Sequence, residues 1–120
     1  MKGYWFIALM LLSISQFSNA ATPEEEISHL IDFVAKSDAV FIRNGTEHSS
    51  QDAAEHLAMK YRKATRYAKT AEKFIENLAS KSSWSGKPYI VKLSNGNLIN
   101  AKDWLSNELK EYRRNQHIHN

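Results

Sequence analysis

The chain has 120 residues, with 16 basic and 13 acidic side chains and no cysteine. This length fits one small domain, and the absence of cysteine excludes a fold held by disulfides. The formal net charge of +3 is too small to indicate a class of partner.

The first twenty residues differ in kind from the rest. Lys2 precedes an uncharged apolar run, Tyr4 to Leu12, which is too short for a membrane helix of roughly 20 apolar residues. Ser18 and Ala20 stand where a signal peptidase reads its substrate. The pattern predicts a secretory signal peptide over residues 1–20, cleaved after Ala20, and no transmembrane segment in the mature chain. An uncleaved membrane anchor is the alternative.

A helix start follows the predicted cut. Thr22 and Glu25 can form a capping box, and Pro23 suits the first helical position. Apolar residues then recur with helical spacing, which predicts an amphipathic helix from about Pro23 to Lys36. These apolar residues are Ile27, Leu30, Ile31 and Val34.

A short strand or extended link is predicted next. Residues 39–42 are apolar and include β-branched and aromatic side chains, and the Asn44-Gly45 pair can turn the chain sharply. Ser49 or Ser50 can then cap a second helix, with Asp52 in its first turn. The stretch is thus expected to be a strand, a turn and a helix cap.

The second helical region is long and rich in alanine. One apolar face persists from Ala53 to Ala79, which predicts either one long helix or two helices in near-continuous register with a break at Thr70. Serines, Gly86 and Pro88 then predict a loop.

The last third of the chain predicts a hairpin and a final helix. Tyr89 to Leu93 and Leu98 to Ile99 are short strand patterns on either side of Asn95-Gly96, a strong hairpin signal. Asn100 can cap a helix, and the tail from about Arg114 lacks a core pattern and is expected to fray. The resulting class is a single α+β domain over residues 21–120, mostly helical, with three to four helices and a small antiparallel sheet.

Two histidines are the first chemical candidates. His48 and His56 have Asp52 and Glu55 nearby, so they could hold a metal ion or serve a small hydrolytic enzyme. Capping by Ser49 or Ser50, however, places His48 outside the helix and separates the two rings. We therefore prefer a capped helix start with two ordinary histidines, and we expect no cofactor. The pair formed by residues 117 and 119 is a weaker metal signal.

The Arg43-Asn44-Gly45 turn is the second candidate. Its arginine can present a planar fork to a carboxylate or phosphate. The alternative is that Arg43 pairs with an acidic residue of the same chain and fastens the turn.

A basic stretch forms the third candidate. It carries no acid and predicts an outward strip around Tyr67 that could meet anionic lipid or glycan, or simply be a solvated helix face. Nucleic acid is not expected as a partner of an exported chain. The basic residues are Lys60, Arg62, Lys63, Arg66 and Lys69.

The serine-rich loop is the fourth candidate. Its serines lack the spacings of a known nucleophile motif. Trp84 is either tucked onto the core or offered to a partner, and the same choice applies to Tyr89. Lys87 lies between them.

The stretches "FIRNG", "AEHLAMKY", "TAEKFIENLASKSSWSGKPYIVKL" and "DWLSNELKEYR" resemble the YfeK-like family of small bacterial periplasmic proteins, a domain of unknown function. The resemblance implies a Gram-negative source and a periplasmic address, but no reaction and no catalytic residues. Many relatives carry cysteines at the positions matching Ala39 and Leu93, which implies that these two residues are neighbours in the fold.

The preferred interpretation is a non-enzymatic periplasmic binding or interaction module of the bacterial envelope. Its partner would be an envelope protein or an anionic envelope component. If the Arg43 turn and the serine-rich loop lie side by side, they form one recognition patch. The candidate binding residues are Arg43, Asn44, Trp84, Lys87 and Tyr89.

Overall fold

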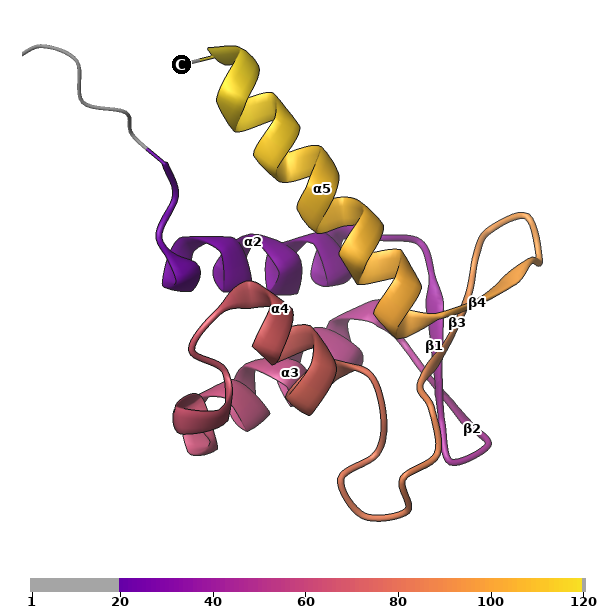
Figure 1. Ribbon diagram of the computed structural model, residues 1–120. Helices are drawn as coiled ribbons and strands as arrows, with labels where there is room; N and C mark the ends of the chain where they lie inside the picture. Colours follow the sequence, from indigo (N-terminus) through magenta and orange to yellow (C-terminus); the bar gives the residue numbers. More distant parts are fainter. Residues whose placement is uncertain (1–19, 120) are drawn as a thin grey trace, which may run out of the picture.

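The computed structural model describes residues 20–119, and the predicted signal peptide lies outside this range except for its last residue. The described chain is an α+β domain, mostly helical, with one antiparallel sheet, as the sequence predicted (Figure 1). None of the helices in residues 20–119 has the length and apolar character that crossing a membrane requires. The helices are α2 (Pro23–Lys36), α3 (Ser50–Lys63), α4 (Ala71–Phe74) and α5 (Ala101–His119), and the strands are β1 (Val40–Arg43), β2 (Thr46–His48), β3 (Ile90–Lys92) and β4 (Leu98–Asn100).

Helix α2 has the predicted bounds and the predicted capping box. The Thr22 hydroxyl accepts from the Glu25 N–H at 3.1 Å, and the Glu25 carboxylate accepts from the Thr22 N–H at 2.8 Å. These reciprocal bonds satisfy donors that a helix start otherwise leaves free. On the apolar face of α2, Ile27, Leu30 and Val34 are fully buried, and Ile31 packs partly buried against the core.

The sheet has the strand order β2-β1-β3-β4. Strand β2 was not predicted, and it pairs with β1 through a two-residue turn at Asn44 and Gly45, both with positive φ. Strand β3 pairs with β1 so that Val40 lies opposite Lys92. Continuing this register by one residue sets Ala39 opposite Leu93, and both line the same small cavity. The neighbourhood implied by the family resemblance is therefore confirmed.

The long helical region is two helices, and the near-continuous register predicted for it is wrong. Helix α3 ends at Lys63, a short 3₁₀ turn follows, and Thr70 caps α4 by accepting from the Lys73 N–H at 3.1 Å. The Thr65 hydroxyl donates to the Tyr61 carbonyl at 2.6 Å, one of the local bonds that compete with a continuing helix. The chain then turns back, so that a π-helical turn, Ile75–Ala79, packs beside α3.

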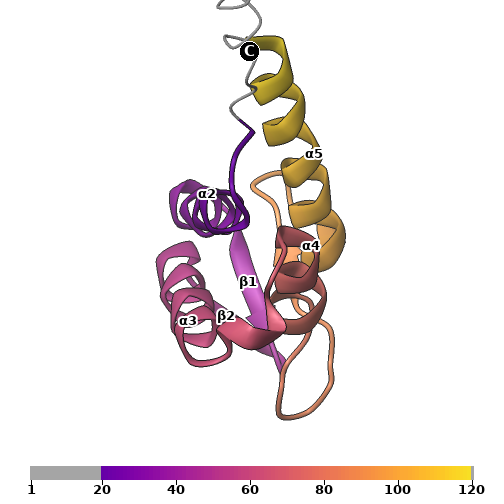
Figure 2. The ribbon, with the colours of Figure 1, turned by 60° about the vertical axis from the view of Figure 1, so that its left-hand side comes forward.

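The four helices of the described chain lie on the same side of the sheet, in two pairs (Figure 1). Figure 2 shows α2 and α3 stacked as one pair and α4 and α5 as the other, with β1 visible between the pairs. Trp104 of α5 reaches across this space to contact the rings of Phe33 and Phe41, at centroid distances of 4.6 and 5.5 Å. Because the same indole touches α2 and β1, it fixes α5 against both.

Helix α5 continues to His119, through the tail that was expected to fray from Arg114. Its distal part projects from the body of the domain (Figure 1). Contacts with α2 hold α5 at the base of this projecting part. His29 of α2 stacks on Tyr112 and lies 2.7 Å from Glu108, while Arg113 binds Glu26 in a bidentate pair at 2.7 and 2.8 Å.

Candidate functional site

A cavity of about 280 Å³ lies between the β1–β2 hairpin and α3. This volume is near the lower end of the roughly 300–1,000 Å³ typical of small-molecule sites. Its floor is apolar and comes from four separate elements, whereas its mouth is polar. The floor residues are Phe41, Ala53, Leu57, Ala79, Ala101 and Leu105.

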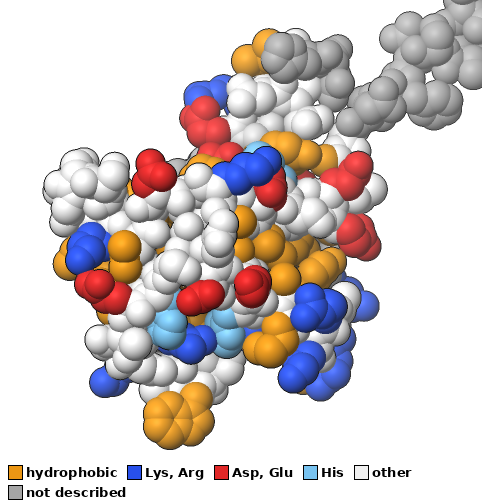
Figure 3. Space-filling view, turned by 180° about the vertical axis from the view of Figure 1, so that it is seen from behind, with side chains coloured by type: hydrophobic (Ala, Val, Ile, Leu, Met, Phe, Trp, Pro, Cys, Tyr) orange, Lys and Arg blue, Asp and Glu red, His pale blue; other side chains and the backbone are white. Residues whose placement is uncertain are grey.

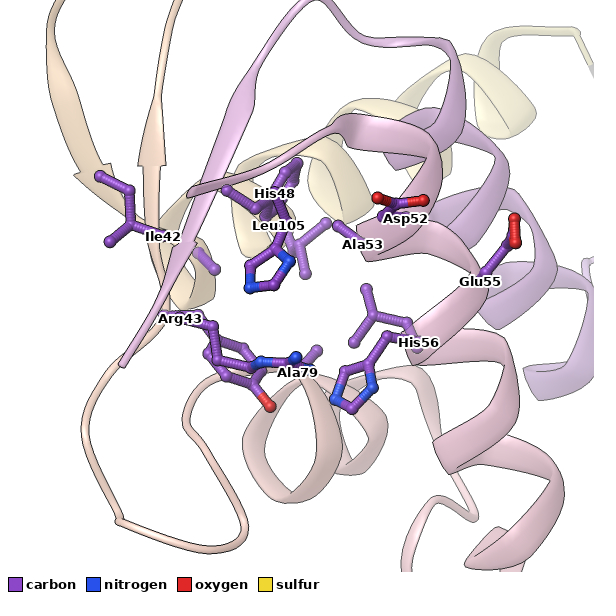
Figure 4. A pocket seen from close by; sticks show the side chains of 13 residues that line it. Ile42, Arg43, His48, Asp52, Ala53, Glu55, His56, Ala79 and Leu105 are labelled. Atoms are coloured by element: carbon purple, nitrogen blue, oxygen red, sulfur yellow. The ribbon is translucent and has the colours of Figure 1, made fainter. Parts of the chain in front are cut away.

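Arg43, His48 and His56 meet at the mouth of the cavity. Figure 4 shows their side chains pointing toward a common space, with Asp52 and Glu55 farther along the rim. Strand pairing explains the first two positions: His48 lies opposite Phe41, and Arg43 is two residues along the same strand, so all three share one face of the hairpin. Helix α3 supplies His56 from the other side.

The two histidines are therefore closer in space than the sequence suggested. Ser49 does cap α3, since its hydroxyl accepts from the Asp52 N–H at 3.1 Å. The inference that this cap separates the rings is wrong, because strand β2 folds His48 back over the cavity that His56 also lines. The missed signal is the Asn44-Gly45 pair, which is typical of a two-residue hairpin turn and thus predicts a returning strand.

Positively charged side chains lie around His56 at the mouth of the cavity. The pKa of His56 lies below its usual value, mainly because the ring is partly buried and also because Arg43, Lys60 and His48 repel a further positive charge. Burial and the Arg43 guanidinium likewise lower the pKa of Lys60. An anion entering the mouth would relieve this repulsion.

Tyr89 and Lys60 form one edge of the site. Tyr89 is only 7% exposed, so it belongs to the core rather than to an open surface. Its hydroxyl accepts from Lys60 Nζ at 3.2 Å, and the same ammonium lies 5.3 Å from the centre of the ring. Burial raises the pKa of the Tyr89 hydroxyl, against the opposing effect of Arg43.

The predicted basic strip is not one helical face. Lys60 turns toward Tyr89, and α3 ends at Lys63. Arg66 lies in the 3₁₀ turn, where its guanidinium stacks 4.7 Å from the ring centre of Tyr67. Arg62, Lys63 and Lys69 are exposed. The five cations are thus divided between the candidate site and a surface around the chain reversal.

Asn44 joins the Arg43 turn to the serine-rich loop. Its backbone adopts φ 52°, a left-handed conformation that is uncommon outside glycine. Its side-chain amide donates to Ser82 Oγ at 3.3 Å and its side-chain oxygen accepts from Ser85 Oγ. The two surfaces that the sequence singled out therefore do lie side by side.

The loop itself is organised around a buried serine and displays a tryptophan. Ser82 Oγ accepts the N–H groups of Trp84 and Ser85, each at 3.2 Å. The Trp84 side chain is 91% exposed, and Lys87 beside it is exposed as well. Of the two interpretations of Trp84, the one in which the ring is tucked onto the core is wrong. Figure 3 shows a protruding hydrophobic side chain below a group of histidine and basic side chains.

Two backbone irregularities border the same cavity. The π-helical turn Ile75–Ala79 ends at Ala79, which lines the floor, and the left-handed Asn44 follows Arg43 at the mouth. π-Helical turns and strained non-glycine residues are both frequent at functional sites. The sequence did not reveal the floor residues, because they come from segments that meet only in the folded chain.

A metal centre finds no support in the part of the chain that the structure describes. Residues 20–119 contain no group of three or more histidine, aspartate or glutamate side chains placed to hold a metal ion. Glu55 is exposed at the rim. The His-x-His pair at residues 117 and 119 belongs to α5 rather than to a loose tail.

Comparison with known proteins gives a family but no activity. Residues 21–113 match the model of a family described as "Family of unknown function (DUF5329)". The chain is 36% identical over 85 residues to the "Uncharacterized protein YfeK" of Salmonella typhimurium, an alignment that covers 69% of this chain and 71% of the relative. No solved structure matches the chain. The resemblance noted from the sequence is thus confirmed.

Proposed function

Because this chain belongs to the DUF5329 family of unknown function, we propose a function from its site: a non-enzymatic binding module of the bacterial envelope, located in the periplasm. The binding surface comprises the cavity with its mouth residues Arg43, His48 and His56, together with the loop that carries Trp84. Below, this set is called the composite site. The periplasmic address rests on the signal-peptide pattern of residues 1–20.

The observation that carries the proposal is the link made by Asn44. One side chain bonds both Ser82 and Ser85, so the Arg43 turn and the Trp84 loop are held as a single surface. Arginine and tryptophan are the residue types that most often dominate binding energy at interfaces. Here they stand on anchored backbone, which lowers the entropy lost on binding.

The solvent exposure of Trp84 supports recognition at this surface. An indole that is 91% exposed leaves a large apolar area in water. Beside it, the cavity offers an apolar floor beneath cationic groups. A ligand or partner that covers the indole and fills the cavity would remove both apolar surfaces from water.

Photo-crosslinking in the native host tests this function. A photo-reactive benzoyl-phenylalanine replaces Trp84, and a control carries it at Asn107, an exposed position on α5. We expect a specific adduct, of protein or small molecule, from position 84 but not from position 107. Equal labelling at both positions, or none at either, would contradict a binding function for the composite site.

A further inference from the structure

We infer that the cavity of the composite site takes a small organic monocarboxylate with a short apolar body, whose carboxylate lies between Arg43, His48 and His56. This inference rests on the proposed binding function and names the chemical class of its ligand. It is carried by the shape of the cavity, by a guanidinium at its mouth with which no carboxylate of residues 20–119 forms a salt bridge, and by the placement of charge around it.

The cavity separates an apolar end from a cationic end. Phe41, Leu57 and Leu105 lie on the floor, while the guanidinium and the two imidazoles lie at the mouth. A volume of about 280 Å³ corresponds to several times the roughly 30 Å³ that a water molecule takes in the liquid. A ligand with a short hydrocarbon body and one polar head matches this division.

Arg43 is available for a ligand. No carboxylate within residues 20–119 forms a salt bridge with its guanidinium. The alternative in which Arg43 fastens the turn by pairing with an acid of its own chain therefore has no support there. A guanidinium matches a carboxylate with two parallel hydrogen bonds, and neutral imidazoles can donate further ones.

Charges of both signs surround the mouth, on different parts of its rim. Arg43 at the mouth and Lys60 against Tyr89 supply positive charge. Asp52 and Glu55 on the α3 rim supply two anions. A carboxylate on the Arg43 side lies away from these two carboxylates, and the apolar floor favours its hydrocarbon body over inorganic phosphate, which has none.

Calorimetry with three probes tests the inference on the mature chain. Hexanoate carries the required carboxylate, hexanamide has nearly the same shape without the charge, and inorganic phosphate supplies a dianion without the apolar body. We expect hexanoate to bind at least about tenfold more tightly than either other probe, as charge-assisted hydrogen bonds imply.

Two variants locate the effect. Arg43→Gln should weaken hexanoate binding about tenfold or more, whereas Arg62→Gln, which removes an exposed arginine of α3 outside the cavity, should leave it unchanged. If Arg43→Gln does not fold, nuclear magnetic resonance of the wild-type chain decides: hexanoate, and not hexanamide, should shift the ring protons of His48 and His56.

Three outcomes would overturn the inference: equal binding of hexanoate and hexanamide, preference for phosphate, or no binding of hexanoate. None of these decides the proposed function, because crosslinking from position 84 does not depend on the ligand's charge. The binding function itself is contradicted by failure of the crosslinking from position 84.

Discussion

The side-chain amide of Asn44 donates to Ser82 Oγ at 3.3 Å, across 38 positions of sequence. This bond connects the hairpin turn to the loop that leads into β3, a strand whose pairing with β1 sets Ile42 opposite Ile90 and so brings the two segments together. Because Ser82 also accepts the N–H groups of Trp84 and Ser85, the position of the indole depends on Asn44 through one intermediate side chain.

Asn44 variants separate the backbone from the side chain at this position. Asn44→Gly tolerates the positive φ and loses only the side-chain bonds, so we expect a loss of about 1 kcal/mol in the free energy of unfolding. Asn44→Ala keeps a Cβ in the left-handed region but loses the short polar side chain that makes asparagine tolerant of it, so we expect it to be about 1–2 kcal/mol less stable than Asn44→Gly. Denaturant unfolding measures the free energy of unfolding of both variants. Equal values would contradict backbone strain from the positive φ at position 44. Relaxation of the Trp84 indole should show faster motion in both.

Arg113→Ala should lower the free energy of unfolding more than removal of an arginine in an exposed ion pair. Arg113 binds Glu26 with two hydrogen bonds and Glu72 with two more, at 2.7 and 3.1 Å, joining α5 to α2 and α4. Glu26 is only 8% exposed, so Arg113→Ala leaves a nearly buried carboxylate without its partner. We expect a loss of about 2–3 kcal/mol in denaturant unfolding.

Arg114→Ala is the matched control for this prediction. Among residues 20–119 its arginine forms a salt bridge only with Glu111, and both side chains are exposed. Such pairs contribute less than about 1 kcal/mol. If Arg114→Ala lost as much stability as Arg113→Ala, the loss would come from substituting any arginine of α5 and not from the contact with Glu26.

The same network predicts an acid dependence. The hydrogen bond from Arg113 holds the pKa of Glu72 below its usual 4.5. Its contribution to stability is therefore present above about pH 4.5 and is lost as the pH falls through the lowered folded-state pKa. Urea unfolding of the wild type and Arg113→Ala should show a stability difference that narrows as the pH falls below about 4. A constant difference would contradict the assignment.

His56 should titrate below the usual value of 6.5. Since the unfolded chain then binds the proton at a higher pH than the folded chain, the free energy of unfolding decreases as the pH falls below about 6.5. His56→Gln removes this dependence and should lose less stability between about pH 7 and pH 5 than the wild type. Parallel losses would contradict the direction given for its pKa.

Arg43 should contribute to that lowered pKa. Burial is the larger cause and stays in place in Arg43→Gln, but the guanidinium charge is removed. Titration of the His56 ring by nuclear magnetic resonance should show a partial rise of the midpoint toward the usual value. Arg62→Gln should leave it where it is, and an unchanged midpoint in Arg43→Gln would place the guanidinium away from the ring.

The register of β1 and β3 predicts a disulfide. Residues directly opposite in an antiparallel pair have Cα atoms about 4.5–5.5 Å apart, within the range that a disulfide bridges. Ala39→Cys combined with Leu93→Cys should therefore oxidise and gain about 2–4 kcal/mol. Thiol titration and denaturant unfolding measure this, with Ala39→Cys alone as control. A double variant that keeps two free thiols would contradict the register.

Local signals made the helix starts predictable from the sequence. The Thr22 and Glu25 box and the Ser49 cap involve residues three positions apart, so the sequence contains the whole interaction. Strand β2 lacks such a signal in its own residues, since only its contact with β1 makes it a strand. The turn before β2 does contain such a signal. Asn-Gly favours a hairpin turn, and it occurs at residues 44–45 as well as at residues 95–96.

The candidate site was predictable in its residue types but not in its assembly. Arg43, Asn44, Trp84 and the histidines stand out in the sequence by chemistry. Their meeting depends on the hairpin and on Asn44 bonding a loop 38 positions away. Lys60 was predicted from helical spacing to lie on an outward basic strip. In the structure its ammonium bonds the Tyr89 hydroxyl and lies at the edge of the cavity.

The most direct test of the binding function combines the photo-reactive residue at position 84 with Arg43→Ala in the native host. If the cavity mouth and the loop bind as one surface, Arg43→Ala should strongly reduce the adduct formed at position 84, while Arg62→Ala should not. An adduct of unchanged identity and yield in the Arg43→Ala chain would contradict a single composite site.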